Sequence, residues 1–96
     1  MTWRNKKLLR AARDQPCVLC GSRGTTVAAH ANSVALGKGT GIKVSDASVA
    51  YLCQYHHDIV DGRSGGLAKE ERLSMWLMAH AKTVQMWFAE GMVVVK

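Results

Sequence analysis

The chain has 96 residues, of which 48% are hydrophobic, and a formal net charge of +6. This length allows one domain, residues 1–96, whose small core needs help from a metal ion, a disulfide or a partner chain. No apolar run reaches the roughly 18 residues of a membrane span, and no apolar signal core follows the basic N-terminus, so we expect a cytoplasmic protein that does not enter a membrane.

The first expected element is a short amphipathic helix from Trp3 to Asp14. Leu8, Leu9 and Ala12 share one side of it, and the other side is basic. Residues 1–43 hold eight basic residues and one acidic residue, whereas residues 44–96 hold five and six. This uneven charge predicts a polyanionic partner, which we take to be DNA. The expected nucleic-acid-binding residues are Arg4, Lys6, Lys7, Arg10, Arg13, Lys38 and Lys43.

Two cysteines follow Pro16 at a spacing typical of metal ligands. Cys17 and Cys20 are too close together for a loop-closing structural disulfide, and the chain has only three cysteines. The pair runs into Gly21 and a turn-rich sequence rather than a helix, which argues against a thioredoxin-type redox motif. Backbone amides in such a turn can point at the sulfur atoms and offset their charge. We therefore predict a zinc knuckle.

Two strands should form a hairpin after the knuckle. The first is expected from Thr25 to Ala29, and the second runs from Ser48 to Leu52 and returns to Cys53. Between them, residues 37–41 are glycine-rich and carry a lysine. We interpret this segment as a DNA-facing loop, although an ordinary mobile connection explains its composition equally well.

A second pair of metal-ligand residues, Cys53 and His56, repeats the spacing of the first pair after an interval of 32 residues. A closed structural zinc site needs four nitrogen or sulfur donors, and the two pairs together supply a Cys3His set. If Cys53 were an ordinary buried thiol and His56 a surface histidine, the first pair would have no explanation. The adjacent His57 is the competing ligand, but the spacing favours His56.

Two helices should complete the chain. Residues 54–61 form a short helix ended by Gly62, and residues 68–90 form a longer one ended by Gly91. An apolar stripe at spacings of three and four predicts one face of the longer helix packed over the hairpin: Leu73, Leu77, Ala81, Val84 and Phe88. Additional residues widen that stripe and suggest a homodimer through the C-terminal helix as an alternative: Met75, Trp76, Met78, Met86 and Trp87.

The predicted fold is therefore α+β: a zinc-stabilised treble clef with an N-terminal basic helix and a long C-terminal helix. The segment Leu52-Cys53-Gln54-Tyr55-His56-His57 resembles the closing segment of the HNH (ββα-metal) endonucleases, in which the last histidine binds a catalytic divalent cation. His30, in VAAH, matches the first histidine of that family. Nearly the whole chain, including AHANS, GKGTGIK and LCQYHHDIVDG, is similar to a family of small lambdoid phage and prophage proteins assigned as nucleases. This resemblance implies a nuclease fold that works in a bacterial host cell.

The residues themselves suit phosphodiester cleavage, which needs a base to activate water and an electrophile near the phosphate. His30 can act as the general base, because an imidazole is neutral near physiological pH. His57 and Asp61 are four residues apart on one helix face and can share Mg2+ or Mn2+. Asp46 can orient His30 or assist the metal. The sequence therefore predicts a metal-dependent DNA endonuclease or nickase.

One departure from the HNH pattern favours a second hypothesis, a non-catalytic zinc-stabilised DNA-binding or adaptor module. Many members of the family have an acidic metal ligand directly before the first histidine, and here that position is Ala29. In this alternative, His30 caps a strand and Asp46 starts a turn. Asp61 then caps a helix or pairs with Arg63.

Overall fold

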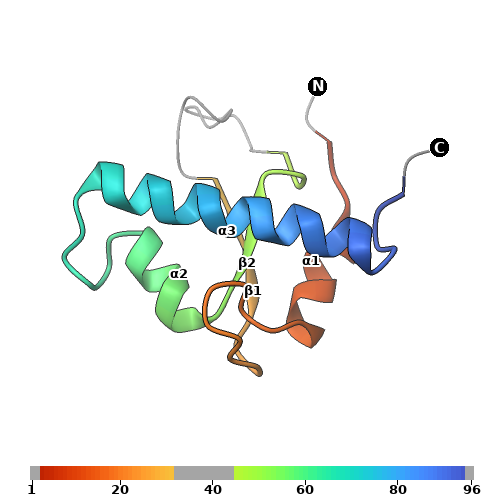
Figure 1. The fold of residues 1–96 in the computed structure, drawn as a ribbon, viewed down its shortest axis with the longest axis horizontal. Coiled ribbons are helices and arrows are strands. Elements are labelled where there is room, and N and C mark those ends of the chain that lie inside the picture. Colours follow the sequence, from red (N-terminus) through yellow and green to blue (C-terminus); the bar gives the residue numbers. More distant parts are fainter. Residues whose placement is uncertain (1–2, 32–44, 95–96) are drawn as a thin grey trace.

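The computed structural model describes residues 3–31 and 45–94. Figure 1 shows a β-hairpin that crosses beneath a long helix, with a shorter helix on either side. In chain order the elements are α1 (Lys6–Ala11), the 3-10 turn η1 (Ala12–Asp14), β1 (Val27–His30), β2 (Val49–Leu52), α2 (Gln54–Val60) and α3 (Lys69–Ala89). This order confirms the predicted α+β fold with its short N-terminal and long C-terminal helices. The glycine-rich segment 37–41, and with it Lys38, lies outside the described residues, as does Lys43.

The two strands pair antiparallel, with Val27 opposite Leu52 and His30 opposite Val49. The prediction that β1 begins at Thr25 was wrong by two residues. Thr25 lies beside the start of α2 instead, where its Oγ1 accepts a hydrogen bond from the Gln54 N–H at 3.4 Å. The strand also ends one residue later than predicted, at His30.

Strand β2 is buried on both faces, because all four of its residues are inaccessible to solvent. Alternate residues of this strand enter two different apolar clusters, as the two-residue period of a strand requires. Ala50 and Leu52 contribute to a cluster with Cys17, Cys53, Val60 and Trp76. Val49 and Tyr51 contribute to the other cluster, with Leu8, Ala12 and Trp87. The first of these clusters adjoins the predicted metal ligands.

Helix α1 is shorter than the predicted helix from Trp3 to Asp14. Asn5 is its N-cap, with an extended backbone (φ −153°) and a side chain that accepts a hydrogen bond from the Leu8 N–H. The backbone N–H of Asn5 donates to Asp46 at 2.7 Å, which holds the segment before the helix in its extended conformation. The chain tightens into η1 at Ala12.

Helices α2 and α3 agree with the prediction to within one residue at each end. Gly62 and Gly91 follow their C-caps with φ of +80° and +70°, a conformation that favours glycine. Helix α3 packs over the hairpin, but the prediction of which face does so was wrong. Its buried residues are Trp76, Ala79, Thr83 and Trp87, whereas Leu73, Leu77 and Phe88 of the predicted stripe are exposed. The face with the two tryptophans is the one buried, because these large side chains remove the most apolar area from water. Met78 is also exposed, and the homodimer stays a prediction. Within the described residues, no helix is both long and apolar enough to span a bilayer.

Candidate functional site

The four predicted zinc ligands come together in one cluster. The donor atoms of Cys17, Cys20, Cys53 and His56 all lie within 4.8 Å of one another. His56 Nδ1 is 3.3 Å from the Cys53 sulfur and 3.7 Å from the Cys17 sulfur, and the sulfur atoms of Cys20 and Cys53 are 3.8 Å apart. A tetrahedral zinc ion places two sulfur ligands about 3.8 Å apart and a sulfur and a nitrogen ligand about 3.6 Å apart. The donor set therefore fits a zinc ion in both chemistry and spacing.

Local backbone structure brings the two ligand pairs together. The first pair lies in a tight turn in which the Gly21 N–H donates to the Cys17 carbonyl and Gly21 has a φ of +77°. The second pair opens α2, with Cys53 as its N-cap and His56 in its first turn. A hydrogen bond from the Val18 N–H to a carbonyl of β2 fixes the knuckle against the hairpin.

The surroundings shift the pKa values of two thiols in this cluster, those of Cys17 and Cys53. Burial raises the pKa of the Cys17 thiol, but backbone N–H groups, that of Cys53 foremost, outweigh this effect and lower its pKa overall. Burial raises the pKa of the Cys53 thiol, and the neighbouring sulfur atoms of Cys20 and Cys17 raise it further. A zinc ion bound here would offset the mutual repulsion of the sulfur ligands, because it binds them as thiolates.

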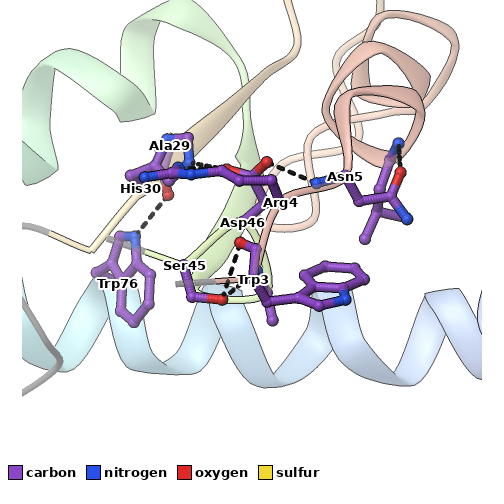
Figure 2. Close-up of polar contacts among 10 residues, drawn as sticks. Trp3, Arg4, Asn5, Ala29, His30, Ser45, Asp46 and Trp76 are labelled. Atoms are coloured by element: carbon purple, nitrogen blue, oxygen red, sulfur yellow. Dashed lines mark hydrogen bonds and ion pairs between the residues drawn. The ribbon is translucent and has the colours of Figure 1, made fainter. Parts of the chain in front are cut away.

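A second polar cluster centres on Asp46, a buried residue that is only 2% exposed (Figure 2). His30 Nε2 lies 3.0 Å from Asp46 Oδ1, and Arg4 Nη1 donates to the same oxygen at 2.9 Å. The other carboxylate oxygen accepts the backbone N–H of Asn5. The structure thus places Asp46 in contact with His30, which is the arrangement needed for Asp46 to orient His30.

This environment determines how His30 is held. Burial raises the pKa of Asp46, but the hydrogen bonds from His30 and Asn5 and the charge of Arg4 outweigh burial and lower its pKa overall. Asp46 is therefore ionised at neutral pH and can only accept hydrogen bonds. In the neutral imidazole, the proton then lies on Nε2 and the lone pair on Nδ1.

The predicted cation ligands, His57 and Asp61, also lie side by side. His57 Nε2 is 3.1 Å from Asp61 Oδ2. The same oxygen accepts a hydrogen bond from Arg63 at 3.0 Å, and Asp61 is also the C-cap of α2. Both contacts are those expected from the non-catalytic hypothesis. In the described parts of the chain, the Cys3His cluster is the one group of at least three His, Cys, Asp or Glu side chains placed to hold a metal ion.

One cavity connects the two halves of the candidate catalytic site. It has a volume of about 530 Å³ and lies between the end of β1, the end of α2 and the beginning of α3. Its ionisable lining residues are His30, Asp61, Lys69, Glu70 and Arg72. His30 and Asp61 therefore share one cavity. Asp46 and His57 do not line it, but each contacts a residue that does: Asp46 contacts His30, and His57 contacts Asp61.

The fold has a counterpart among solved structures. A "putative bacteriophage protein" from Escherichia coli K-12 superposes on this chain with a TM-score of 0.64 and 22% sequence identity. The match covers 88% of this chain and 99% of the other. At this identity the likeness shows a common fold. No family model matches the chain, and no curated protein is similar enough to count as a match.

Three of the basic residues expected to bind DNA lie on α1, and a fourth lies in η1 directly after it. Lys6, Lys7, Arg10 and Arg13 are exposed. The guanidinium of Arg4 is ion-paired with Asp46, although its side chain stays 41% exposed. The role of all of these residues in binding DNA stays a prediction.

Sequence reasoning missed three charged residues of the site. It did not find that Arg4 contacts Asp46, because the two residues are 42 positions apart and no local pattern connects them. It also missed Lys69 and Arg72, which line the cavity from the first two turns of α3. The available signal was their spacing of three residues, which places both on one helix face.

Proposed function

We propose that this protein is a metal-dependent DNA endonuclease or nickase of the HNH type, of phage or prophage origin, which acts in the cytoplasm of a bacterial host. The observation that carries the proposal is the His30–Asp46 pair, in which a buried carboxylate holds an imidazole that lines a cavity. Asp61 lines the same cavity and is itself paired with a second histidine. A histidine held by a buried carboxylate at the wall of a cavity suits general-base catalysis of phosphodiester hydrolysis.

In this proposal the zinc ion is structural. Cys17, Cys20, Cys53 and His56 would hold it and thereby join the knuckle to the start of α2. The four protein donors complete a tetrahedron and leave no position for water or substrate, which is the property of a structural site. The cluster supports the candidate catalytic site indirectly, because α2 also carries His57 and ends at Asp61.

His30 acts as the general base. Asp46 accepts a hydrogen bond from the Nε2–H of His30, which leaves the lone pair of Nδ1 free to take a proton from the attacking water. The imidazolium that forms is stabilised by the Asp46 carboxylate. Arg4 and the Asn5 N–H fix that carboxylate, so the ring is held in one orientation before substrate arrives.

His57 and Asp61 would hold Mg2+ or Mn2+, which supplies a positive charge to stabilise the phosphate during cleavage. Two protein ligands suffice for such an ion when water molecules and phosphate oxygens complete its shell. Arg63 competes for the same carboxylate oxygen of Asp61, so the cation must displace or share that contact. The exposed lysines and arginines of α1 would bind the DNA backbone through its charge.

The alternative function is a zinc-stabilised DNA-binding or adaptor module without catalysis. Two observations favour it. Ala29 is buried and offers no ligand where many HNH enzymes have an acidic residue, and Asp61 is already neutralised by Arg63. A module of this kind needs the basic face of α1 and the Cys3His cluster but has no use for the pairing of His30 with Asp46.

Plasmid nicking distinguishes the two functions. Zinc-loaded protein is incubated with supercoiled plasmid, with and without Mg2+ or Mn2+, and the open-circular and linear products are separated on a gel. We expect nicking that depends on the divalent ion and is lost in His30→Ala. Lys82→Gln, which changes an exposed residue on α3, is the control and should nick normally. Plasmid that is bound by the wild-type protein but stays supercoiled with either ion would support the DNA-binding module instead.

A further inference from the structure

Arg72 lies in the second turn of α3, with its guanidinium against the turn that follows α2. A Cβ built on Gly62 would lie 2.5 Å from Arg72 Nη1 and 3.0 Å from its Cζ. The guanidinium therefore occupies the space that a side chain at position 62 would fill. The end of the Arg72 side chain is flexible and could move aside, so glycine is favoured at position 62 by its φ of +80°.

The charge of Arg72 has no partner among the residues that the structure describes. Its Nε is buried and makes no hydrogen bond within residues 3–31 and 45–94. Asp61 lines the same cavity, but its Oδ2 is engaged by His57 and Arg63 instead. A buried donor without an acceptor destabilises a fold, so such a group is expected to have another role.

We propose that Arg72, with Lys69 beside it, is the binding site for the phosphate group of the DNA substrate. The guanidinium is a planar fork that matches two oxygen atoms of a phosphate, and Lys69 adds a second positive charge at the same cavity. Glu70 also lines the cavity, and its carboxylate would repel an anion. The carboxylate of Asp61 is already paired with Arg63, so the two positive charges of Arg72 and Lys69 face one carboxylate that is unpaired within the described residues. This inference rests on the proposed function and names the part of the site that holds the substrate.

The position of Arg72 relative to His30 is fixed by the fold. Trp76 lies one turn after Arg72 on α3, and its indole N–H donates to the Ala29 carbonyl at 3.0 Å (Figure 2). Because Ala29 directly precedes His30, this bond ties the end of β1 to the helix that carries Arg72. Both Arg72 and His30 line the same cavity. A phosphate bound by Arg72 is therefore presented to the proposed base.

The test measures DNA binding separately from cleavage. A fluorescein-labelled DNA duplex is titrated with zinc-loaded protein over a range of salt concentrations, without Mg2+ or Mn2+, and binding is followed by fluorescence anisotropy. Arg72→Gln should weaken binding about tenfold at low salt and reduce the salt slope by about one. Lys82→Gln removes the same charge from an exposed position of α3 and should change affinity by less than about twofold. Circular dichroism verifies that both variants are folded.

Arg72→Lys keeps the charge but removes the fork, and it tests the proposal even if Arg72→Gln does not fold. It should keep the salt slope of the wild type, whereas its cleavage rate at saturating DNA should fall about 100-fold. Unchanged affinity and slope in Arg72→Gln, or an unchanged cleavage rate in Arg72→Lys, would overturn the phosphate site while leaving the nuclease intact. If the wild type binds DNA through Arg72 but never cleaves it, the phosphate site stands and the proposed function fails.

Discussion

Replacing Asp46 by asparagine should both destabilise the protein and impair the proposed general base. Asp46 is almost fully buried and accepts hydrogen bonds from three donors: His30, Arg4 and the backbone of Asn5. An asparagine of the same shape has one acceptor oxygen and one NH2 group. Whichever way its amide is turned, the NH2 group faces at least one of these N–H donors, so a buried donor loses its acceptor.

The loss of stability in Asp46→Asn depends on how exposed each hydrogen-bond partner of Asp46 is. Loss of a hydrogen bond between a buried carboxylate and the Asn5 N–H costs about 1.5–3 kcal/mol. The Arg4 side chain is 41% exposed and can return to water, so its pair contributes at most about 1 kcal/mol. We therefore expect Asp46→Asn to lower the free energy of unfolding by about 2–4 kcal/mol.

The pKa of Asp46 determines the pH at which this effect is measured. Although burial raises that pKa, hydrogen bonds from His30 and Asn5 and the charge of Arg4 lower it overall. A carboxylate with a lowered pKa stabilises the fold in full above the pKa of the unfolded chain, and this stabilisation is lost as the pH falls through the lowered value. At pH 7 the whole contribution is therefore present, and it is lost progressively once the pH falls below about 5.

Urea denaturation of the zinc-loaded protein at pH 7, followed by tryptophan fluorescence, measures this free energy. Asp58→Asn is the matched control, because Asp58 forms an exposed ion pair with Arg63 and its loss should cost less than about 1 kcal/mol. Asp46→Asn should also slow plasmid nicking in molecules that remain folded. Equal stability of the two variants would refute the hydrogen-bond reasoning, and normal nicking by Asp46→Asn would refute its role in orienting His30.

Three further predictions concern other parts of the site. His56→Ala should lose zinc, measured by metal analysis, and melt at a lower temperature, whereas His57→Ala should keep zinc and lose ion-dependent nicking; the opposite pattern would reverse the ligand assignment. Gly62→Ala should destabilise the fold by about 1 kcal/mol in urea titrations, since its φ of +80° disfavours any residue with a Cβ; a neutral effect would contradict that backbone conformation. DNA affinity should fall steeply with salt and weaken in Lys7→Gln, and an affinity independent of salt would exclude phosphate contacts from α1.

The fold was predictable from the sequence because its strongest signals are local. The repeated spacing of Cys17–Cys20 and Cys53–His56 indicated the cluster, and the structure brings these donors together. Turn glycines and helical periodicity located the ends of α2 and α3. The start of β1 was misplaced because strand propensity at Thr25 says nothing about its contact with α2.

The candidate catalytic half of the site could be predicted only in part. His57 and Asp61 are four residues apart on one helix, so their contact follows from helical geometry. The carboxylate that holds His30 also binds Arg4, a residue 42 positions away, and only the folded chain brings these groups together. The same is true of the cavity, where Arg72 meets His30 across two elements.

The rate at which zinc-loaded wild-type protein and His30→Ala nick supercoiled plasmid in Mg2+ or Mn2+ tests the central claim most directly. Both proteins should bind the plasmid equally at fixed salt, because His30 lies outside the basic face of α1. If His30 is the general base, its replacement should slow nicking by about 100-fold or more. Equal nicking rates for the two proteins would contradict the mechanism.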